Sequence, residues 1–383
     1  MSKKMLTFAV AKVLNTKTET KMKKTIQQIG ILIAWLACPV LMQAQQLPDP
    51  HFENWSDKFK GDVQLVDWHG SNVSQVGSKF TFMYQKQGRT GFCAYVQDRS
   101  IGIPKLNLGA TGPGYMSLGI PWQYLKGLNM NSATAGTEGG IAWKYRPDTM
   151  AVWIKRTGEN TDKEDFHLLF YSWEGTARSS TYKSKAGGCT PTERVNEESD
   201  IRTKTNYNEC GTDELVKQIA EGWYRARAKY NDWTLIKVPI LYTNDGKPTM
   251  CNVIFSAGNY PAFRANDGLY DGNALYVDDV ELIYSSRIDK LLINSVEWKG
   301  FNPNSDKVQT YKLKGTKDIK IEALRGVGSL TNIKGETAQF KGRHLDNKEM
   351  TIEAGEINGK PWVITVKAED GSSTHVYKVK FEI

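Results

Sequence analysis

The sequence predicts an all-β protein made of two sandwiches, and three observations support this. From about residue 46 to residue 286 the chain is a succession of short runs rich in β-branched and aromatic residues, such as "FTFMYQ" and "CNVIFSAG". Glycine, asparagine, aspartate and proline separate these runs, a spacing typical of an antiparallel sandwich. Beyond about residue 287 the chain becomes richer in lysine and threonine, and its runs alternate apolar with polar residues.

The second region, residues 287–383, carries a hairpin signal of its own. The alternating runs "WVITVKAE" and "HVYKVKFEI" flank Asp370-Gly371, a dipeptide that favours a tight turn. Alternating runs over this length predict a small immunoglobulin-like sandwich. We place the boundary between the two regions at Ser285 to Asp289, so the first domain covers residues 45–286.

One stretch predicts a helix among the strands. In "GTDELVKQIAEGW", Thr212 can cap the start, and the two acids after it suit the positive end of the helix dipole. Leu215 and Ile219 share one face, and Gly222 can end the helix. We expect a short helix that braces the sandwich.

The N-terminus has the layout of a secretory signal peptide, residues 1–44. A basic start precedes an apolar stretch from Ile29 to Met42, and a small residue, Ala44, stands before the predicted cleavage site. The apolar stretch is short for a membrane span. Met22 is an alternative start, and Cys38 leaves a lipid anchor open, although Trp35 stands where a lipobox has leucine. We expect a periplasmic, cell-surface or extracellular protein.

The basic charge belongs mostly to that leader. The whole chain has a formal charge of +8, and residues 1–44 hold seven lysines and one glutamate. The remainder therefore has a charge near +2. This gives no electrostatic case for binding nucleic acid, so we expect no such partner.

Four cysteines follow the leader, and an even count in an exported chain permits disulfides with three possible pairings. Cys189 and Cys210 bracket a polar, loop-like stretch and are the favoured pair. Cys93 and Cys251 lie in strand-like runs and are equally compatible with buried thiols. The chain has no CxxC spacing, so a zinc or thioredoxin-type site has no support.

Most catalytic signatures are absent. The five histidines are scattered, and the chain contains no GxSxG motif, P-loop or dinucleotide fingerprint. A pair of carboxylates for glycoside hydrolysis stays open, because such acids can be distant in sequence. The candidates in strand-like contexts are Glu53, Asp165, Glu174 and Asp278, and nothing singles out one of them as an acid with a raised pKa.

Tryptophan is the strongest functional signal, because flat indole rings stack on sugar rings. Ten tryptophans follow the leader, eight of them before residue 287. Three lie inside strand-like runs and are expected in the core: Trp153, Trp173 and Trp233. The aromatic residues beside turn residues are the candidates for exposure and ligand binding: Trp68, Tyr115, Trp122, Tyr124, Trp143 and Trp223.

The run "GNALYVDDVELIY" places a carboxylate where alternation predicts an apolar side chain. With strict alternation, Tyr276, Asp278 and Val280 share one face with Leu282. Asp278 then points into apolar surroundings and needs a partner, whereas Asp279 can be solvated.

The start and the end of the first region resemble a known family. "FENW" near the N-terminus and "LYVDDVELIY" resemble the jelly-roll (galactose-binding-like) carbohydrate-binding modules. "GGIAWKYRPDTMAVWIKR", "VPILYTNDGKPTMCNVIFSAGNY" and "GNALYVDDVELIY" resemble the putative carbohydrate metabolism domain of exported Bacteroidetes proteins, over roughly residues 46–286. The resemblance implies a jelly-roll fold and an association with glycans, and it transfers no catalytic residue.

The resemblance also implies two possibilities for Asp278. Jelly-roll modules often hold a structural calcium ion where the first and last strands meet, which would make Glu53 and Asp278 its ligands. Alternatively, Asp278 accepts hydrogen bonds from backbone N–H groups of the N-terminal segment.

Together these features predict an exported, non-catalytic glycan-binding protein. Two other classes stay open. One is a glycoside hydrolase or lyase that acts through a carboxylate pair. The other is a structural or adhesion protein with a protein partner, whose signature would be an exposed apolar patch. A membrane contact is expected only if Cys38 carries a lipid.

Overall fold

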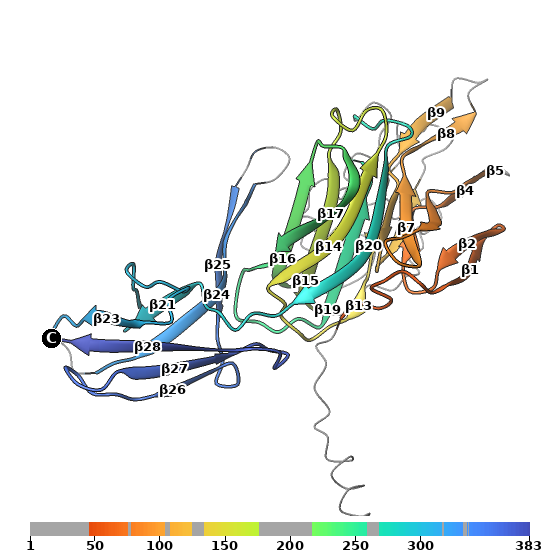
Figure 1. Cartoon of the computed structure of the whole chain (residues 1–383). Helices are drawn as coiled ribbons and strands as arrows, with labels where there is room; N and C mark the ends of the chain where they lie inside the picture. The colour runs from red at the N-terminus through yellow and green to blue at the C-terminus, as the bar shows by residue number, and fades with distance from the viewer. Residues whose placement is uncertain are drawn as a thin grey trace, which may run out of the picture. The chain divides into compact units, whose positions relative to one another are not determined.

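The computed structural model describes most of the chain beyond the predicted leader, and every regular element in this part is a strand (Figure 1). The expected all-β class is therefore confirmed. No helix in this part has the length and apolarity needed to cross a bilayer. The described residues are 46–75, 78–103, 108–124, 134–175, 217–258, 268–315, 318–331, 335 and 337–383.

Two sheets form the layers of the first region (Figure 1). The five-stranded sheet has the order β17(Tyr230–Pro239), β14(Thr149–Thr157), β20(Ala274–Ile283), β7(Phe92–Gln97) and β6(Met83–Gln87). The seven-stranded sheet has the order β18(Leu241–Tyr242), β16(Lys217–Ala226), β15(Phe166–Glu174), β19(Met250–Ser256), β10(Tyr115–Ser117) and β3(His69–Gly70), with β13(Ile141–Ala142) paired to β19. All these pairings are antiparallel, as the short runs and turn residues predict.

Alternate residues of both sheets fill the core between them. Trp68, from the segment before β3, packs on Phe52 and stacks on Phe255 of β19, with ring centroids 5.5 and 5.6 Å apart. Its indole N–H donates to the Pro48 carbonyl at 2.9 Å. Burial of such large aromatic side chains is a major source of stability for a sandwich.

Four two-stranded ribbons lie outside the main sheets. They are β1(Trp55–Phe59) with β2(Asp62–Leu65), β4(Val73–Gln75) with β5(Ser78–Phe80), β8(Arg99–Ile103) with β9(Leu108–Gly112), and β11(Ile120–Tyr124) with β12(Thr134–Glu138).

Two four-stranded sheets follow β20 in the chain and share one apolar cluster that includes Leu291, Ile364 and Tyr377. The predicted hairpin at Asp370-Gly371 is confirmed, because it joins two antiparallel strands and Gly371 has a φ of 74°. The first sheet has the order β22(Val296–Glu297), β21(Lys290–Ile293), β24(Ile321–Thr331) and β25(Thr337–His344); the second has the order β23(Val308–Lys312), β28(Thr374–Glu382), β27(Trp362–Lys367) and β26(Met350–Glu353).

The change from one set of sheets to the other falls near the expected boundary. β20 ends at Ile283, and β21 begins at Lys290 in a separate sheet. The domain limits, and the jelly-roll and immunoglobulin-like assignments, stay predictions.

The helix expected from Thr212 to Gly222 is wrong over the part that the structure describes. Residues from Lys217 onward form strand β16, which pairs with β15 on one side and β18 on the other. The spacing of Leu215 and Ile219 is even, so it fits one face of a strand as well as one face of a helix. Pairing on both edges outweighs the local helix preference.

A buried ionic cluster joins the two sets of sheets. The Glu349 carboxylate accepts two hydrogen bonds from Arg343, both at 2.7 Å, one from Arg325 at 3.1 Å and one from Arg146 at 3.1 Å. Arg146 precedes β14 in the first region, and the other residues belong to the C-terminal sheets. All four side chains are at most 4% exposed.

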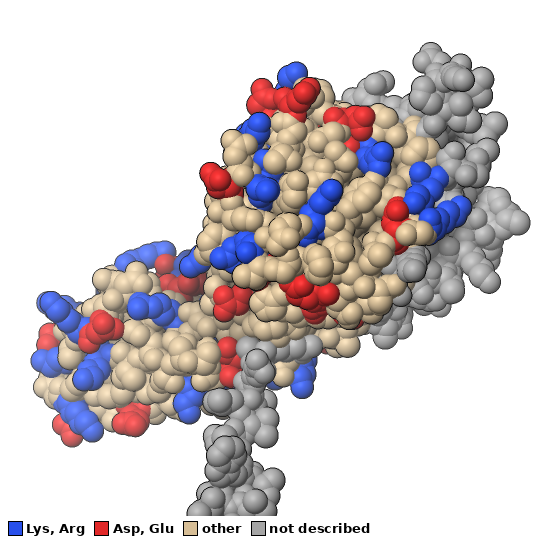
Figure 2. Space-filling view, turned by 45° about the vertical axis from the view of Figure 1, so that its right-hand side comes forward, with Lys and Arg blue, Asp and Glu red and all other residues tan. Residues whose placement is uncertain are grey.

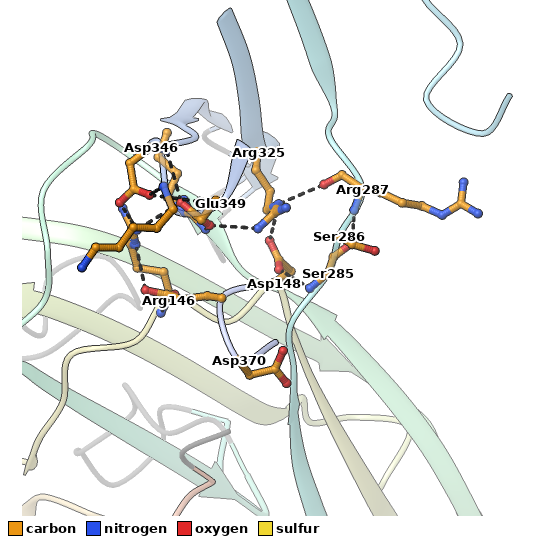
Figure 3. Close-up of polar contacts among 12 residues, drawn as sticks. Arg146, Asp148, Ser285, Ser286, Arg287, Arg325, Asp346, Glu349 and Asp370 are labelled. Carbon is orange, nitrogen blue, oxygen red and sulfur yellow. Dashed lines mark hydrogen bonds and ion pairs between the residues drawn. The ribbon is translucent and has the colours of Figure 1, made fainter. Parts of the chain in front are cut away.

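Further contacts extend this cluster, as Figure 3 shows for Arg325 between Glu349 and Asp148. Arg325 Nε donates to the Arg287 carbonyl at 2.9 Å, and Asp148 accepts from the backbone N–H of Ser285 at 2.6 Å. Burial alone would raise the pKa of Glu349, but the hydrogen bonds and charges of the arginines hold it below its ordinary value. Glu349 is therefore ionised over the physiological pH range.

The Glu349→Gln substitution should lower the free energy of unfolding by about 3–5 kcal/mol, because three buried guanidinium groups lose their shared counter-charge. Urea unfolding of residues 45–383 measures this. Glu382→Gln is the matched control: Glu382 pairs with Lys380 at 2.9 Å on the surface, so its loss should cost less than about 1 kcal/mol. Equal losses in the two variants would contradict the role assigned to Glu349.

Candidate functional site

A β-bulge in β20 decides which residues of the five-stranded sheet face outward. The pairing of β20 with β14 shifts register between Ala151 and Trp153, so Asp279 and Val280 together oppose a single residue of β14. Asp279 has a φ of 45°, in the left-handed region that aspartate tolerates. The expected strict alternation is therefore wrong. Before the bulge Leu275 and Val277 are the core residues, and after it Val280 and Leu282.

The bulge places Asp278 on the outer face, opposite Trp153, yet this carboxylate is fully buried. The turn between β6 and β7 covers it. Asp278 accepts a hydrogen bond from the backbone N–H of Arg89 at 2.7 Å and one from that of Asp279 at 2.9 Å. Burial raises the pKa of Asp278 to about 6 although these N–H groups oppose the shift. Backbone N–H groups thus hold the carboxylate, but they come from this turn and from β20, not from the N-terminal segment.

Glu53 holds the other end of the same turn. Its carboxylate accepts from the backbone N–H of Phe92 at 2.9 Å. Gly91 has a φ of 60°, and a Cβ there would lie 2.0 Å from the Glu53 carboxylate, so only glycine fits this turn. The segment just before β1 and strand β20 therefore both contact the β6–β7 turn.

The residues present do not fit the expected calcium ion well. The oxygens of Asp278 and one oxygen of Glu53 already accept N–H groups, which a cation would repel. Calcium takes six to eight oxygen ligands. Within the described ranges no three His, Cys, Asp or Glu side chains form a group that could hold a metal. The calcium ion remains a prediction that this geometry does not support.

Four aromatic side chains cross the outer face of the five-stranded sheet, and we call them the aromatic row: Tyr84, Tyr95, Tyr276 and Trp233. Tyr84 pairs with Tyr95, Tyr95 with Tyr276, and Tyr276 with Lys155, so β6, β7, β20 and β14 each contribute one residue in register. Ring centroids are 6.0 Å apart for the first pair and 4.7 Å for the second. Trp233 of β17 extends the row, 6.3 Å from Tyr276. All four rings, and Lys155, are half-buried.

Cationic side chains lie over these rings. The Lys155 ammonium lies 4.4 Å from the Tyr276 ring centroid and 5.8 Å from that of Trp233. The Lys86 ammonium lies 5.5 Å from the Tyr95 centroid. Each distance is within the range of a cation–π contact.

A third cation lies beside the row, over Trp153, which stands two residues before Lys155 in β14. The Arg89 guanidinium stacks 3.9 Å from the ring centroid of Trp153 and pairs with Asp279. Asp279 also accepts a hydrogen bond from His51 Nδ1 at 2.7 Å. Basic and acidic side chains are interspersed on the face drawn in Figure 2, with no continuous basic area. This is in keeping with the small net charge of the chain beyond residue 44.

Burial corrects part of the sequence-based choice of exposed aromatic residues. Trp68 and Trp143 were expected at the surface but are 1% and 2% exposed, because each packs among other rings despite its neighbouring turn residues. Conversely, Trp153 and Trp233 were expected in the core but lie half-exposed on the outer face. Trp173 is buried as expected. A position inside a strand does not imply burial, because alternate residues face opposite sides.

Two of the predicted ligand-binding residues do meet in one cluster. Tyr115 and Trp223 pack with Tyr171, Trp173 and other residues on the face of the seven-stranded sheet opposite its sandwich core. Tyr115 is only 3% exposed, and the Arg225 guanidinium lies 5.1 Å from the Trp223 centroid. Trp122 and Tyr124 lie in β11, and their side chains fall outside the described residues. None of the six predicted residues belongs to the aromatic row.

Two of the acids chosen from the sequence lie in separate ion pairs. Asp165 lies 3.4 Å from Arg227, and Glu174 lies 3.7 Å from Lys217, in ordinary surface ion pairs. A different pair converges instead. Both Asp98 and Glu164 point at Gly258, where a Cβ would lie 2.3 Å from Asp98 Oδ2 and 2.0 Å from Glu164 Oε1.

This second pair is buried among polar groups. Asp98 and Glu164 are 0% and 1% exposed. Asp98 accepts from the Gly114 N–H at 2.7 Å, and Glu164 accepts from the Asn273 amide at 2.6 Å. Burial and the neighbouring Glu164 raise the pKa of Asp98 well above its ordinary value. A proton shared between the two carboxylates is therefore favoured. Neither acid is open to solvent, so the geometry does not present them to a sugar.

The Asp98→Asn substitution should stabilise the protein at pH 8 and give no gain at pH 4. The pKa of Asp98 is higher in the folded state than in the unfolded chain. Its contribution to the free energy of unfolding is therefore fully present below the ordinary pKa of 3.8 and is lost as the pH rises through the folded-state pKa. The asparagine amide can accept a hydrogen bond from the Gly114 N–H and donate one to Glu164, and it does not have to take up a proton from solvent to do so. We expect a gain in the free energy of unfolding on the order of 1 kcal/mol or more. Thermal unfolding across this pH range measures it, and parallel profiles for wild type and variant would contradict the shared proton.

The structure describes two of the four cysteines beyond residue 44. Cys93 and Cys251 are buried free thiols, one of the two alternatives that the sequence left open. Cys189 and Cys210, and with them the favoured disulfide, lie outside the described residues.

Comparison with known proteins finds similarity to solved structures over part of the chain, at low sequence identity. No protein-family model and no curated protein matches the chain. A Bacteroides thetaiotaomicron structure described as a putative glycoside hydrolase is 16% identical over 61% of this chain and 70% of its own, with a TM-score of 0.38. A Bacteroides vulgatus structure with the same description is 16% identical over 61% of this chain and 96% of its own, with a TM-score of 0.35. We take neither fold detail nor activity from these structures.

Proposed function

We propose that this chain binds glycans without cleaving them, and that the aromatic row is the platform. The observation that carries the proposal is the register of Tyr84, Tyr95 and Tyr276 across three neighbouring strands. The rings form a half-exposed surface that crosses the sheet rather than a buried core. Aromatic rings stack on the apolar faces of sugars, and their hydroxyl groups hydrogen-bond at the edge.

Exposure favours this face over the other aromatic cluster. In the other cluster the rings of Tyr115, Tyr171 and Trp173 are at most 4% exposed, so a sugar ring could not stack on them without rearrangement. Among the rings of that cluster only Trp223 is half-exposed, so it offers a single ring and not a row. The rings of the row are already half-exposed on a paired, five-stranded sheet. A preorganised platform of this kind loses little conformational entropy when it binds.

The proposal includes the setting that the sequence predicts. The chain acts outside the cytoplasm, in the periplasm, at the cell surface or beyond it, and belongs with the putative carbohydrate metabolism domain proteins of Bacteroidetes. Support for both comes from the leader at residues 1–44 and from the three matching stretches of sequence.

Replacement of Tyr276 by alanine should weaken glycan binding about tenfold, because the central ring of the row is lost, which corresponds to about 1.4 kcal/mol. Affinity electrophoresis of residues 45–383, in gels cast with plant, host and microbial polysaccharides, measures the affinity. Phe92→Ala is the matched control. Phe92 is 43% exposed on the same strand as Tyr95, three residues away and therefore on the opposite face by alternation.

Three outcomes would contradict the proposal in different ways. Binding that Tyr276→Ala leaves unchanged would move the site away from the row. Polysaccharide recovered in shortened form would indicate a glycoside hydrolase. No retardation by any polysaccharide would favour a structural or adhesion role with a protein partner.

A further inference from the structure

The cations over the aromatic row are the feature that glycan binding alone does not explain. Lys86, Arg89 and Lys155 lie over Tyr95, Trp153 and Tyr276, respectively. Sugar stacking needs only the rings, so positive groups over Tyr95 and Tyr276 of the row, and over Trp153 beside it, require a further reason.

The acids on this face are already engaged or distant, which leaves the two lysines without a counter-charge. Asp278 is fully buried, and Asp279 pairs with Arg89 and His51. Among the described residues neither Lys86 nor Lys155 forms an ion pair. Their ammonium groups therefore remain able to pair with an anion brought by a ligand.

The position of Lys155 discriminates between neutral and acidic sugars. It stands in register with Tyr276, and its ammonium lies over that ring. A neutral sugar that stacks on Tyr276 must displace the ammonium, at a cost of about 0.5–1 kcal/mol for an exposed contact. A sugar with an anionic group can instead form a charge-assisted hydrogen bond with the displaced ammonium while its ring stacks. The same side chain thus opposes one ligand class and attracts the other.

We propose that the ligand of the aromatic row is an acidic polysaccharide, with carboxylate or sulfate groups that Lys86 and Lys155 neutralise. This inference rests on the glycan-binding function proposed above and names its ligand class. The shared chemistry is an anion repeated along a sugar chain, so that adjacent units can meet both lysines. Screening by salt should weaken such binding more than it weakens stacking.

Matched polymers separate charge from sugar structure and carboxylate from sulfate. Affinity electrophoresis of residues 45–383 should show binding to polygalacturonate but weaker binding to its methyl ester, or binding to dextran sulfate but weaker binding to dextran. The double substitution Lys86→Gln and Lys155→Gln should weaken binding to the acidic polymer at least tenfold. Lys367→Gln, at the exposed last residue of β27 in the C-terminal sheets, is the matched control and should leave it unchanged.

The outcomes distinguish the two proposals. In one outcome the protein binds the neutral polymers, Tyr276→Ala abolishes this binding and the lysine substitutions leave it intact. This would overturn the proposal of an acidic ligand but keep the glycan-binding function. In another outcome, Lys367→Gln and the double variant weaken binding to the acidic polymer equally. This would show a general effect of charge and would also overturn the acidic ligand. Binding to neither member of either pair would overturn it as well. Thermal unfolding of each variant checks that the fold is intact.

Discussion

One buried carboxylate, Glu349, is shared by three guanidinium groups and joins the two sets of sheets through Arg146. Arg343, Arg325 and Arg146 are almost fully buried, and each would cost several kcal/mol without a counter-charge. Because Arg146 lies just before β14, the same cluster fixes the start of a central strand of the five-stranded sheet.

A second constraint, the bulge at Asp279, turns the outer face of the five-stranded sheet into a functional surface. Without the extra residue, Asp278 would share a face with Val280 and Leu282 in the core. With it, Tyr276 and Asp278 face outward while the later apolar residues return inward. The carboxylate then holds the β6–β7 turn through the Arg89 N–H, and Arg89 in turn covers Trp153. One backbone irregularity thus links the fold to the row and its cations.

The all-β class and the Asp370-Gly371 hairpin could be predicted from sequence because period-two alternation and turn residues are local signals. The bulge could not, since a single extra residue shifts the faces without any change in composition. Tyr84, Tyr95 and Tyr276 are visible in three separate runs, but only strand pairing brings them together. Trp68 and Trp143 were misplaced because neighbouring turn residues say little about what packs on a ring. Asp98 and Glu164 carried no local signal at all.

The most direct test of the central claim is a crystal structure of residues 45–383 with a bound acidic oligosaccharide, such as an oligogalacturonide. We expect one sugar ring stacked on Tyr276 or Tyr95, with its carboxylate within hydrogen-bond distance of the Lys155 or Lys86 ammonium. An oligosaccharide bound on the other sheet, at the cluster of Tyr115 and Trp223, would contradict this account, as would an empty row in crystals that bind the sugar elsewhere.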